Sequence, residues 1–372
     1  MKIVTVVGTR PEIIKLSRII NKFDKYFDNI LIHTGQNFDY ELNEIFFKGL
    51  SIRKPNYFLN AAQKTPASFI GEVFKKIEPI LLDEKPEAFF ILGDTNSCLS
   101  AIVAKKHKIP IFHLEAGNRS FDERVPEEIN RRIVDHISDI NLTYSNISRE
   151  CLVKEGISPE RIIVVGSPLC EIHNHYKNKV RSSNILKKIN VKKKKFFVFS
   201  IHREENVENI ENLKKLNIIF KTLLDKYDYD IIVSTHPRTK SNLDKINIIK
   251  NKRLKFFKPF GFFDYVKLQI NSCCVLSDSG SITEESAILN FPALNLREAH
   301  ERHEGMEEGC VMMVGFNDKL ILKCLDILKN QFVKSKNVLN KVNAYNVPNV
   351  SEKIVRIIPS YVDYVNKFIW KK

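Results

Sequence analysis

The stretch that decides the fold is KIVTVVGTRPE, at residues 2–12. Residues 3–7 are all β-branched, which is typical of a short strand. After Gly8, Thr9 can cap a helix, Pro11 suits the first helical turn, and Glu12 completes a capping box. Apolar residues then recur at helical spacing over residues 13–20. The sequence therefore predicts a strand, a tight turn and a helix.

The same order of elements repeats along the chain. Strand-like runs separated by helical patterns occur at residues 29–34, 88–93, 109–114, 139–144 and 161–165. Gly166, Ser167 and Pro168 break the pattern, a polar stretch follows, and a second series has strand-like runs at 196–201, 230–235, 254–260, 273–278 and 293–296. Strands that alternate with helices predict an α/β fold with parallel sheets. We expect two such domains, with a boundary near residues 168–190.

The two halves contain equivalent units. ILGDTN at residues 91–96 and VLSDSG at residues 275–280 each end a predicted strand, precede a helix, and lead to a proline-containing strand. In parallel sheets, ligands lie beyond the carboxyl ends of the strands. We therefore expect the functional residues at these strand ends.

Composition limits the classes of protein. The 372 residues suffice for two or three domains, and no apolar run approaches the length of a membrane span. The seven cysteines form no CxxC pair, which favours a reduced, cytoplasmic protein. The formal net charge of +15 raises the possibility of nucleic-acid binding, but the excess is largely lysine, as at residues 192–195, and biased composition explains it more simply.

Charged candidates cluster at the strand ends of the first half. Arg10 lies at a helix N-terminus, which favours anions, and Lys15 follows about one turn later. Asp94 and Glu115 end strands, and Glu127 begins a helix, so they could divide acid and base roles. Helix capping would also explain Asp94 and Glu127, but it explains Glu115 less well.

The second half offers a complementary set. His202 and His236 follow its first two strands and could stabilise a diphosphate. The turn at Ser279 and Gly280 exposes backbone N–H groups that can hold phosphate, and Glu285 could accept from ribose hydroxyls. A serine N-cap beside acidic residues would be the ordinary alternative.

Taken together, these motifs resemble the non-hydrolysing UDP-N-acetylglucosamine 2-epimerase family. The resemblance runs from residue 3 to about residue 315 and rests on motifs in a fixed order: GTRPE (8–12), HTGQ (33–36), GDT (93–95), HLEAG (113–117), PEE (126–128), HR (202–203), DSG (278–280) and ER (301–302).

The resemblance implies a GT-B fold, with two Rossmann-like domains and the nucleotide sugar in the cleft between them. It implies domains at residues 1–168 and 169–350, and a C-terminal segment, 351–372, that packs back on the first domain. It also implies a homodimer that inverts C2 of a UDP-2-acetamido sugar by eliminating and re-adding UDP. Neither a metal nor a nicotinamide cofactor is expected, and neither a nucleic acid nor a membrane is expected as a partner.

The resemblance also assigns roles to residues. Asp94, Glu115 and Glu127 form the acid/base set, while Arg10, Lys15 and His202 stabilise the departing UDP. Residues expected to bind the nucleotide are Ser279, Gly280 and Glu285 at the diphosphate and ribose, Tyr265 against uracil, and His236 and Arg302 as further candidates. Tyr265 could equally be a core aromatic residue.

Some details depart from the usual family pattern. Ser281 stands where a second glycine is common, and His303 stands where proline is common. Residues 37–40 lack the histidine-containing run of members activated by a second UDP-sugar. EAGNRSFDERVPEEINRR (115–132), GSP (166–168) and REAHER (297–302) are similar to enzymes that convert UDP-2-acetamido-2,6-dideoxy-L-talose to UDP-N-acetyl-L-fucosamine for capsule or O-antigen synthesis.

Other readings remain open at this stage. A GT-B glycosyltransferase would share the fold and the UDP-sugar but would need an acceptor site. A hydrolysing epimerase would release UDP and the free sugar. A nucleic-acid-binding protein would explain the net charge, but no RRM, KH or zinc-finger signature is present.

Overall fold

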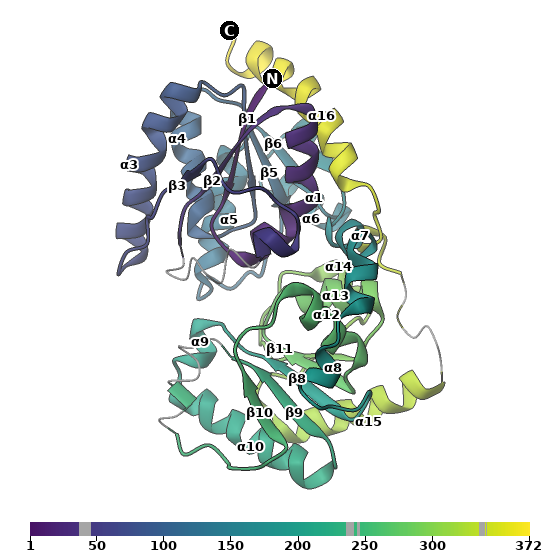
Figure 1. The fold of residues 1–372 in the computed structure, drawn as a ribbon. Coiled ribbons are helices and arrows are strands. Elements are labelled where there is room, and N and C mark those ends of the chain that lie inside the picture. Colours follow the sequence, from purple (N-terminus) through teal and green to yellow (C-terminus); the bar gives the residue numbers. More distant parts are fainter. Residues whose placement is uncertain (37–45, 236–241, 244–245, 335–338, 340) are drawn as a thin grey trace. The chain divides into compact units, whose positions relative to one another are not determined.

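The chain folds into two compact units. The computed structural model describes all of its residues except 37–45, 236–241, 244–245, 335–338 and 340. Unit 1 comprises residues 1–174 and 343–372, and unit 2 comprises residues 175–342 (Figure 1). The sequence-based boundaries are 168 and 350, so the structure shifts both divisions by a few residues.

Unit 1 is built on a parallel sheet. From one edge to the other, its strands are β3 (Tyr57–Phe58), β2 (Asp28–His33), β1 (Lys2–Val7), β4 (Ala88–Leu92), β5 (Ile111–Ala116), β6 (Ile140–Thr143) and β7 (Ile162–Val164). The helical elements of this unit include α1 (Arg10–Tyr26), α3 (Pro66–Glu84), η1 (Asn96–Ser100), α4 (Ala101–Lys106), α5 (Pro126–Ile137), α6 (Asn146–Lys154), η2 (Pro159–Arg161) and η3 (Asn343–Tyr345). Helix α7 (Leu169–Ser182) begins in unit 1 and continues into unit 2.

The C-terminal segment belongs to unit 1. Its helices are α16 (Val350–Tyr364) and η4 (Val365–Ile369), and α16 lies beside α1 (Figure 1). Glu352 accepts a hydrogen bond from Lys22 of α1, and Glu171 accepts one from the Ser351 backbone N–H at 2.9 Å. The ring of Trp370 lies 4.8 Å from the Lys105 ammonium. These contacts hold the end of the chain against the helices of the first sheet.

Unit 2 repeats the architecture. Its parallel sheet has the order β10 (Leu254–Phe257), β9 (Asp230–Ser234), β8 (Phe196–Ser200), β11 (Cys274–Ser277), β12 (Ala293–Asn295) and β13 (Met312–Met313). Its described helices are α8 (Ile185–Lys188), α9 (Glu204–Val207), α10 (Ile210–Lys226), α12 (Phe262–Asn271), α13 (Ser281–Leu289), α14 (His303–Glu307) and α15 (Asp318–Lys334).

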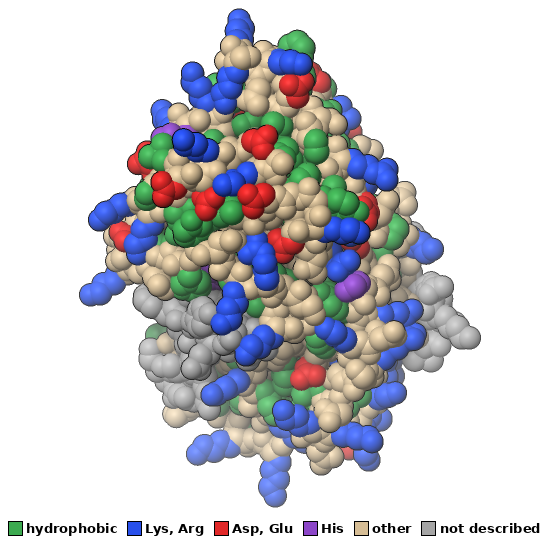
Figure 2. Space-filling view, turned by 45° about the horizontal axis from the view of Figure 1, so that its top comes forward, with side chains coloured by type: hydrophobic (Ala, Val, Ile, Leu, Met, Phe, Trp, Pro, Cys, Tyr) green, Lys and Arg blue, Asp and Glu red, His purple; other side chains and the backbone are tan. Residues whose placement is uncertain are grey.

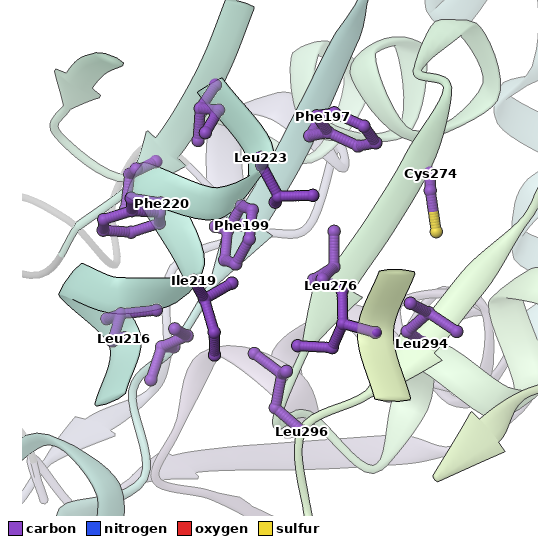
Figure 3. Packing of buried hydrophobic residues seen from close by; sticks show 14 of the residues in the cluster. Phe197, Phe199, Leu216, Ile219, Phe220, Leu223, Cys274, Leu276, Leu294 and Leu296 are labelled. Carbon is purple, nitrogen blue, oxygen red and sulfur yellow. The ribbon is translucent and has the colours of Figure 1, made fainter. Parts of the chain in front are cut away.

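Apolar packing holds the helices of unit 2 on its sheet. Phe199 of β8 and Leu276 of β11 lie against Ile219, Phe220 and Leu223 of α10 in one buried cluster (Figure 3). The rings of Phe199 and Phe220 meet edge to face at 5.0 Å between centroids. Burial of such side chains is the main source of stability in an α/β layer.

The predicted α/β fold with two Rossmann-like parallel sheets is confirmed. The short edge strands β3 and β13 were not predicted, because two residues carry no readable periodicity. The polar stretch after residue 174 contains helical residues of α7 and α8, which its composition alone did not indicate.

The surface matches the simpler explanation of the net charge. Figure 2 shows Lys and Arg side chains scattered over the visible face, with Asp and Glu among them. Among the described residues, no helix combines the length and the apolar character that crossing a bilayer requires.

Candidate active site

The turn between β1 and α1 is organised by Glu12. Its buried carboxylate accepts hydrogen bonds from the backbone N–H groups of Gly8 at 2.5 Å and Thr9 at 2.7 Å, so the capping box has formed. The Thr95 hydroxyl, from the turn after β4, donates to the same carboxylate at 2.6 Å. Burial raises the pKa of Glu12 despite these donors. Glu12 thus links the turn after β1, next to Arg10, with the turn after β4, next to Asp94.

Gly8 makes this junction possible. A Cβ atom at Gly8 would lie 2.0 Å from the Ser97 hydroxyl and 2.5 Å from that of Thr34. Those two hydroxyls are themselves hydrogen-bonded at 2.8 Å. The backbone of the first turn therefore packs directly on polar side chains at the carboxyl edge of the sheet.

Glu115 has an unusual backbone. Its φ is +73°, and the pairing of β5 with β6 shifts register between Leu114 and Ala116. A glutamate in the left-handed region costs about 1–3 kcal/mol, and bulges of this kind re-aim a side chain. Strand β5 runs from Ile111 to Ala116, and Glu115 is its last residue but one, close to the strand end where the sequence placed it.

The Glu115 carboxylate receives two donors on one oxygen. The Lys15 ammonium lies 2.5 Å from Oε2, and the Tyr144 hydroxyl donates to the same atom at 2.8 Å. All three side chains are buried, and the ammonium also lies 5.5 Å from the Tyr144 ring centroid. The structure therefore brings Lys15 and Glu115 together, and adds Tyr144, which sequence reasoning did not single out.

Gly117 fixes the chain just after Glu115. Its φ is +79°, and a Cβ atom there would lie 2.3 Å from the carbonyl oxygen of Ser148 in α6. Glycine is thus required at this position for both its conformation and its size.

Asp94 is held by an arginine. Nε of Arg131 donates to Oδ2 of Asp94 at 2.7 Å, and Nη1 donates to Oε2 of Glu128 at 2.8 Å. Glu128 also accepts from the backbone N–H of Ser120 at 2.9 Å. Burial opposes ionisation of Glu128, but the Ser120 and Arg131 donors together hold its pKa below the usual range. Glu127 lies one residue earlier, partly exposed in the first turn of α5.

A second network of buried polar side chains lies beside the carboxyl ends of β4 and β5. His113 of β5 contacts the carbonyl oxygen of Gly93 through Nε2 at 2.8 Å, and its Nδ1 lies 2.9 Å from Oδ1 of Asp135 without the alignment of a hydrogen bond. Arg119 pairs with Asp135 at 2.7 Å and binds Glu155 through two nitrogens. Burial alone would raise the pKa of Asp135, but His113 and Arg119 lower it.

In unit 2, Asp278 orders the turn after β8. It is fully buried and accepts hydrogen bonds from the backbone N–H groups of His202 at 3.2 Å and Arg203 at 3.1 Å. The amide of Asn206 donates to it at 3.0 Å, and Nδ1 of His202 lies 3.2 Å away. The His202 ring is nearly half exposed, so it can reach a ligand while Asp278 orients it.

The turn from β11 into α13 is narrow. The Ser279 backbone N–H donates to the Ser277 hydroxyl at 3.1 Å, and the hydroxyls of Ser279 and Ser281 lie 3.0 Å apart. A Cβ atom at Gly280 would lie 2.3 Å from a carboxylate oxygen of Glu301. Small residues at this helix start leave its N–H groups accessible, as anion binding requires.

The remaining candidates of unit 2 have defined partners. Glu285 accepts from the Gln269 amide at 2.6 Å, and buried Arg302 donates to Glu284 at 2.9 Å. Burial and, secondarily, the Glu285 charge raise the pKa of Tyr265, so its hydroxyl stays neutral. His236 lies outside the described residues.

Within each unit, the candidate residues gather at the carboxyl edge of the sheet. In unit 1 these are Arg10, Lys15, Asp94, Glu115 and Glu127, and in unit 2 they are His202, Tyr265, Ser279, Gly280, Glu285 and Arg302. Sequence reasoning did not single out Tyr144 and Arg131, which contact the candidate residues Glu115 and Asp94. Arg131 follows Asn130 one turn into α5, where its spacing from Glu128 could have suggested a pair.

Comparison with known proteins gives a consistent result. The family model described as UDP-N-acetylglucosamine 2-epimerase matches residues 21–359. The structure of UDP-N-acetylglucosamine 2-epimerase from Rickettsia bellii is 46% identical, covers both chains completely, and superposes with a TM-score of 0.92.

Two further relatives broaden the picture. The UDP-GlcNAc 2-epimerase of Methanocaldococcus jannaschii, solved in complex with UDP-GlcNAc and UDP, is 36% identical, covers 97% of this chain and all of its own, and has a TM-score of 0.89. The UDP-2,3-diacetamido-2,3-dideoxy-D-glucuronate 2-epimerase of Pseudomonas aeruginosa is 30% identical over 87% of this chain and 91% of its own length.

Proposed function

The chain belongs to the UDP-N-acetylglucosamine 2-epimerase family, and we propose that it reversibly inverts C2 of a UDP-2-acetamido sugar by eliminating and re-adding UDP. The observation that carries the proposal is the buried Lys15–Glu115 pair, which lies at the same sheet edge as Asp94. A cation and two carboxylates at one edge suit a reaction that moves a proton and releases an anion.

The reaction balances without an added redox partner. A carboxylate removes the proton from C2, the C1=C2 double bond forms, and the C1–O bond breaks with its electron pair leaving on the diphosphate of UDP. The intermediate is a 2-acetamidoglucal. Delivery of a proton to the opposite face of C2, with return of UDP to C1, gives the epimer.

Different residues serve the two halves of this reaction. We assign the proton transfers to Asp94, Glu115 and Glu127, and the stabilisation of departing UDP to Arg10, Lys15 and His202. A negative diphosphate leaves more readily when preorganised cations and N–H groups face it. The ion pairs support the first role, because Lys15 and Arg131 hold the carboxylates of Glu115 and Asp94 in place.

We assign UDP binding to the start of α13 and its neighbours. Ser279 and Gly280 begin a helix whose N–H groups suit phosphate, and Glu285 suits ribose hydroxyls. Tyr265 would lie against uracil, with His236 and Arg302 as further binding residues. The complex of the Methanocaldococcus jannaschii relative with UDP-GlcNAc and UDP supports a nucleotide sugar as the ligand.

The sugar itself is the finer part of the proposal. We propose two candidates, UDP-N-acetylglucosamine and UDP-2-acetamido-2,6-dideoxy-L-talose, the second supported by the motifs at residues 115–132 and 297–302 and pointing to capsule or O-antigen precursors. The glucuronate-type substrate in the name of the Pseudomonas aeruginosa relative shows that sugars differ within these relatives. We further propose a homodimer, which light scattering of the purified protein tests.

The experiment is a proton NMR assay of purified protein with each UDP-sugar separately. We expect two C2 epimers to reach equilibrium with UDP still attached to both. Turnover of one sugar and not the other assigns the substrate. Release of UDP with the free sugar would indicate hydrolysis instead, and unchanged spectra with every candidate would refute epimerisation. Glu115→Gln, which keeps the shape but removes the charge, serves as the inactive control.

A further inference from the structure

The hydroxyl of Tyr144 makes a hydrogen bond that the packing of its ring does not require. Tyr144 follows β6, the strand that pairs with β5, and its side chain is fully buried. Its hydroxyl donates to Oε2 of Glu115 at 2.8 Å. An aromatic core residue in this position could be phenylalanine, so the hydroxyl serves the carboxylate rather than the packing.

The contact acts on a residue whose geometry is already constrained. Glu115 has a left-handed backbone at the register shift of β5, which fixes the direction of its side chain. The Lys15 ammonium and the Tyr144 hydroxyl approach one oxygen of the carboxylate from different elements. Two donors on Oε2 restrict rotation of the carboxylate and stabilise its negative charge.

We propose that Tyr144 is a positioning residue of the reaction, which together with Lys15 holds Glu115 ionised and in one orientation for proton transfer. This inference rests on the proposed function, since it assigns a residue to the same acid/base set. Tyr144 does not itself exchange a proton with the substrate. It acts through Glu115.

The neighbouring charges allow us to predict the direction in which protonation of Glu115 changes when the Tyr144 hydroxyl is removed. Other charged groups that the structure describes at this edge include Arg10 and Glu12 on α1, Asp94 after β4, and Glu127, Glu128 and Arg131 on α5, with Arg131 paired to both Asp94 and Glu128. His113, on β5 itself, contacts Asp135. Removal of the Tyr144 hydroxyl takes a donor away from a carboxylate and leaves these charges unchanged. The carboxylate should then hold its proton to higher pH.

The chain offers a matched control. Lys2, Glu84 and Tyr57 form a second lysine–glutamate–tyrosine group, with the Tyr57 hydroxyl donating to Glu84 at 2.7 Å and Lys2 donating at 2.8 Å. Lys2 begins β1, at the opposite edge of the sheet from the candidate site. Tyr57→Phe therefore removes the same kind of hydrogen bond without touching Glu115.

The test is the pH profile of kcat/KM for epimerisation in wild type, Tyr144→Phe and Tyr57→Phe. We expect the acidic limb of Tyr144→Phe to move to higher pH by about one to two units, and that of Tyr57→Phe to coincide with wild type. A Tyr144→Phe profile that coincides with wild type would overturn the inference. So would an equal loss of rate at every pH, which is the signature of a structural role.

Two further measurements remove the dependence on the folding of Tyr144→Phe and on catalysis one at a time, since the first does not use Tyr144→Phe and the second does not use catalysis. Incorporation of 3-fluorotyrosine makes the phenol a stronger donor, so the acidic limb should move to lower pH; no movement would count against the inference. Carbon-13 NMR of labelled glutamate carboxyls, with Glu115 assigned through Glu115→Gln, follows its protonation directly. Equal titration of Glu115 in wild type and Tyr144→Phe would refute the inference even if no substrate is found.

Discussion

Gly117→Ala is the substitution whose cost can be worked out most completely. The added Cβ atom would lie 2.3 Å from the Ser148 carbonyl oxygen and 2.9 Å from its carbonyl carbon. These are backbone atoms of α6, so they cannot move aside as the end of a side chain can. The substitution also places alanine at a φ of +79°.

Comparison with Gly93→Ala separates the cost of a left-handed alanine from the cost of the overlap with Ser148. Gly93 has a φ of +77°, but a Cβ atom there would meet nothing within 4 Å. Alanine in a left-handed conformation costs about 1–2 kcal/mol in both variants. Overpacking adds about 1–3 kcal/mol at Gly117 alone. We therefore expect Gly117→Ala to lose about 2–5 kcal/mol of the free energy of unfolding, and Gly93→Ala about 1–2 kcal/mol.

Urea unfolding followed by tryptophan fluorescence measures these costs, and the single tryptophan of the chain confines the signal to one unit. Trp370 lies in unit 1, beside Lys105, so its fluorescence reports unfolding of the unit that carries both glycines. With a urea m-value of about 2 kcal/mol/M, the midpoint of Gly117→Ala should fall about 0.5–1.5 M below that of Gly93→Ala. Equal midpoints for the two variants would refute the packing argument.

Two other predictions concern the buried charges. Arg131→Met removes the partner of Asp94. We expect kcat to fall by about 10- to 100-fold because that carboxylate is misplaced, while calorimetry finds UDP binding little changed. A similar loss of UDP affinity would show that Arg131 binds the nucleotide instead. Because the pKa of Asp135 is lowered in the folded state, its carboxylate contributes stability above its unfolded pKa of about 3.9, and this contribution is lost as pH falls further. Asp135→Asn should lose about 3 kcal/mol at pH 7 and show a shallower decline below about pH 4 than wild type, measured by Trp370 fluorescence in urea; parallel declines would contradict this.

The local sequence was sufficient to predict the sheets and the strand ends. Runs of β-branched and aromatic residues mark central strands such as β1 and β8, and the capping box at Thr9 and Glu12 marks the start of α1. Both signals are local, since a strand or a cap is specified by residues a few positions apart. The edge strand β3 is specified by its pairing with β2, which no local pattern records.

Residue type and position along the strands predicted which residues are candidates for the site, but not which of them contact one another. Lys15 and Glu115 were both expected at the site, but their contact joins residues from α1 and β5. Tyr144 was not expected, because its hydrogen bond to Glu115 joins residues at the ends of two neighbouring strands that are far apart in the sequence. Asp135 and Arg119 were missed for the same reason, since a buried pair looks like two surface residues in a helical or loop pattern.

The central claim is reversible proton exchange at C2, and NMR in deuterated water tests it most directly. We predict that deuterium replaces the proton at C2 in both epimers of the sugar that is turned over, with UDP attached at equilibrium, and that Asp94→Asn abolishes this exchange while still binding UDP. Interconversion of the epimers with protium retained at C2 would contradict elimination and re-addition, as would the absence of exchange with every candidate UDP-sugar.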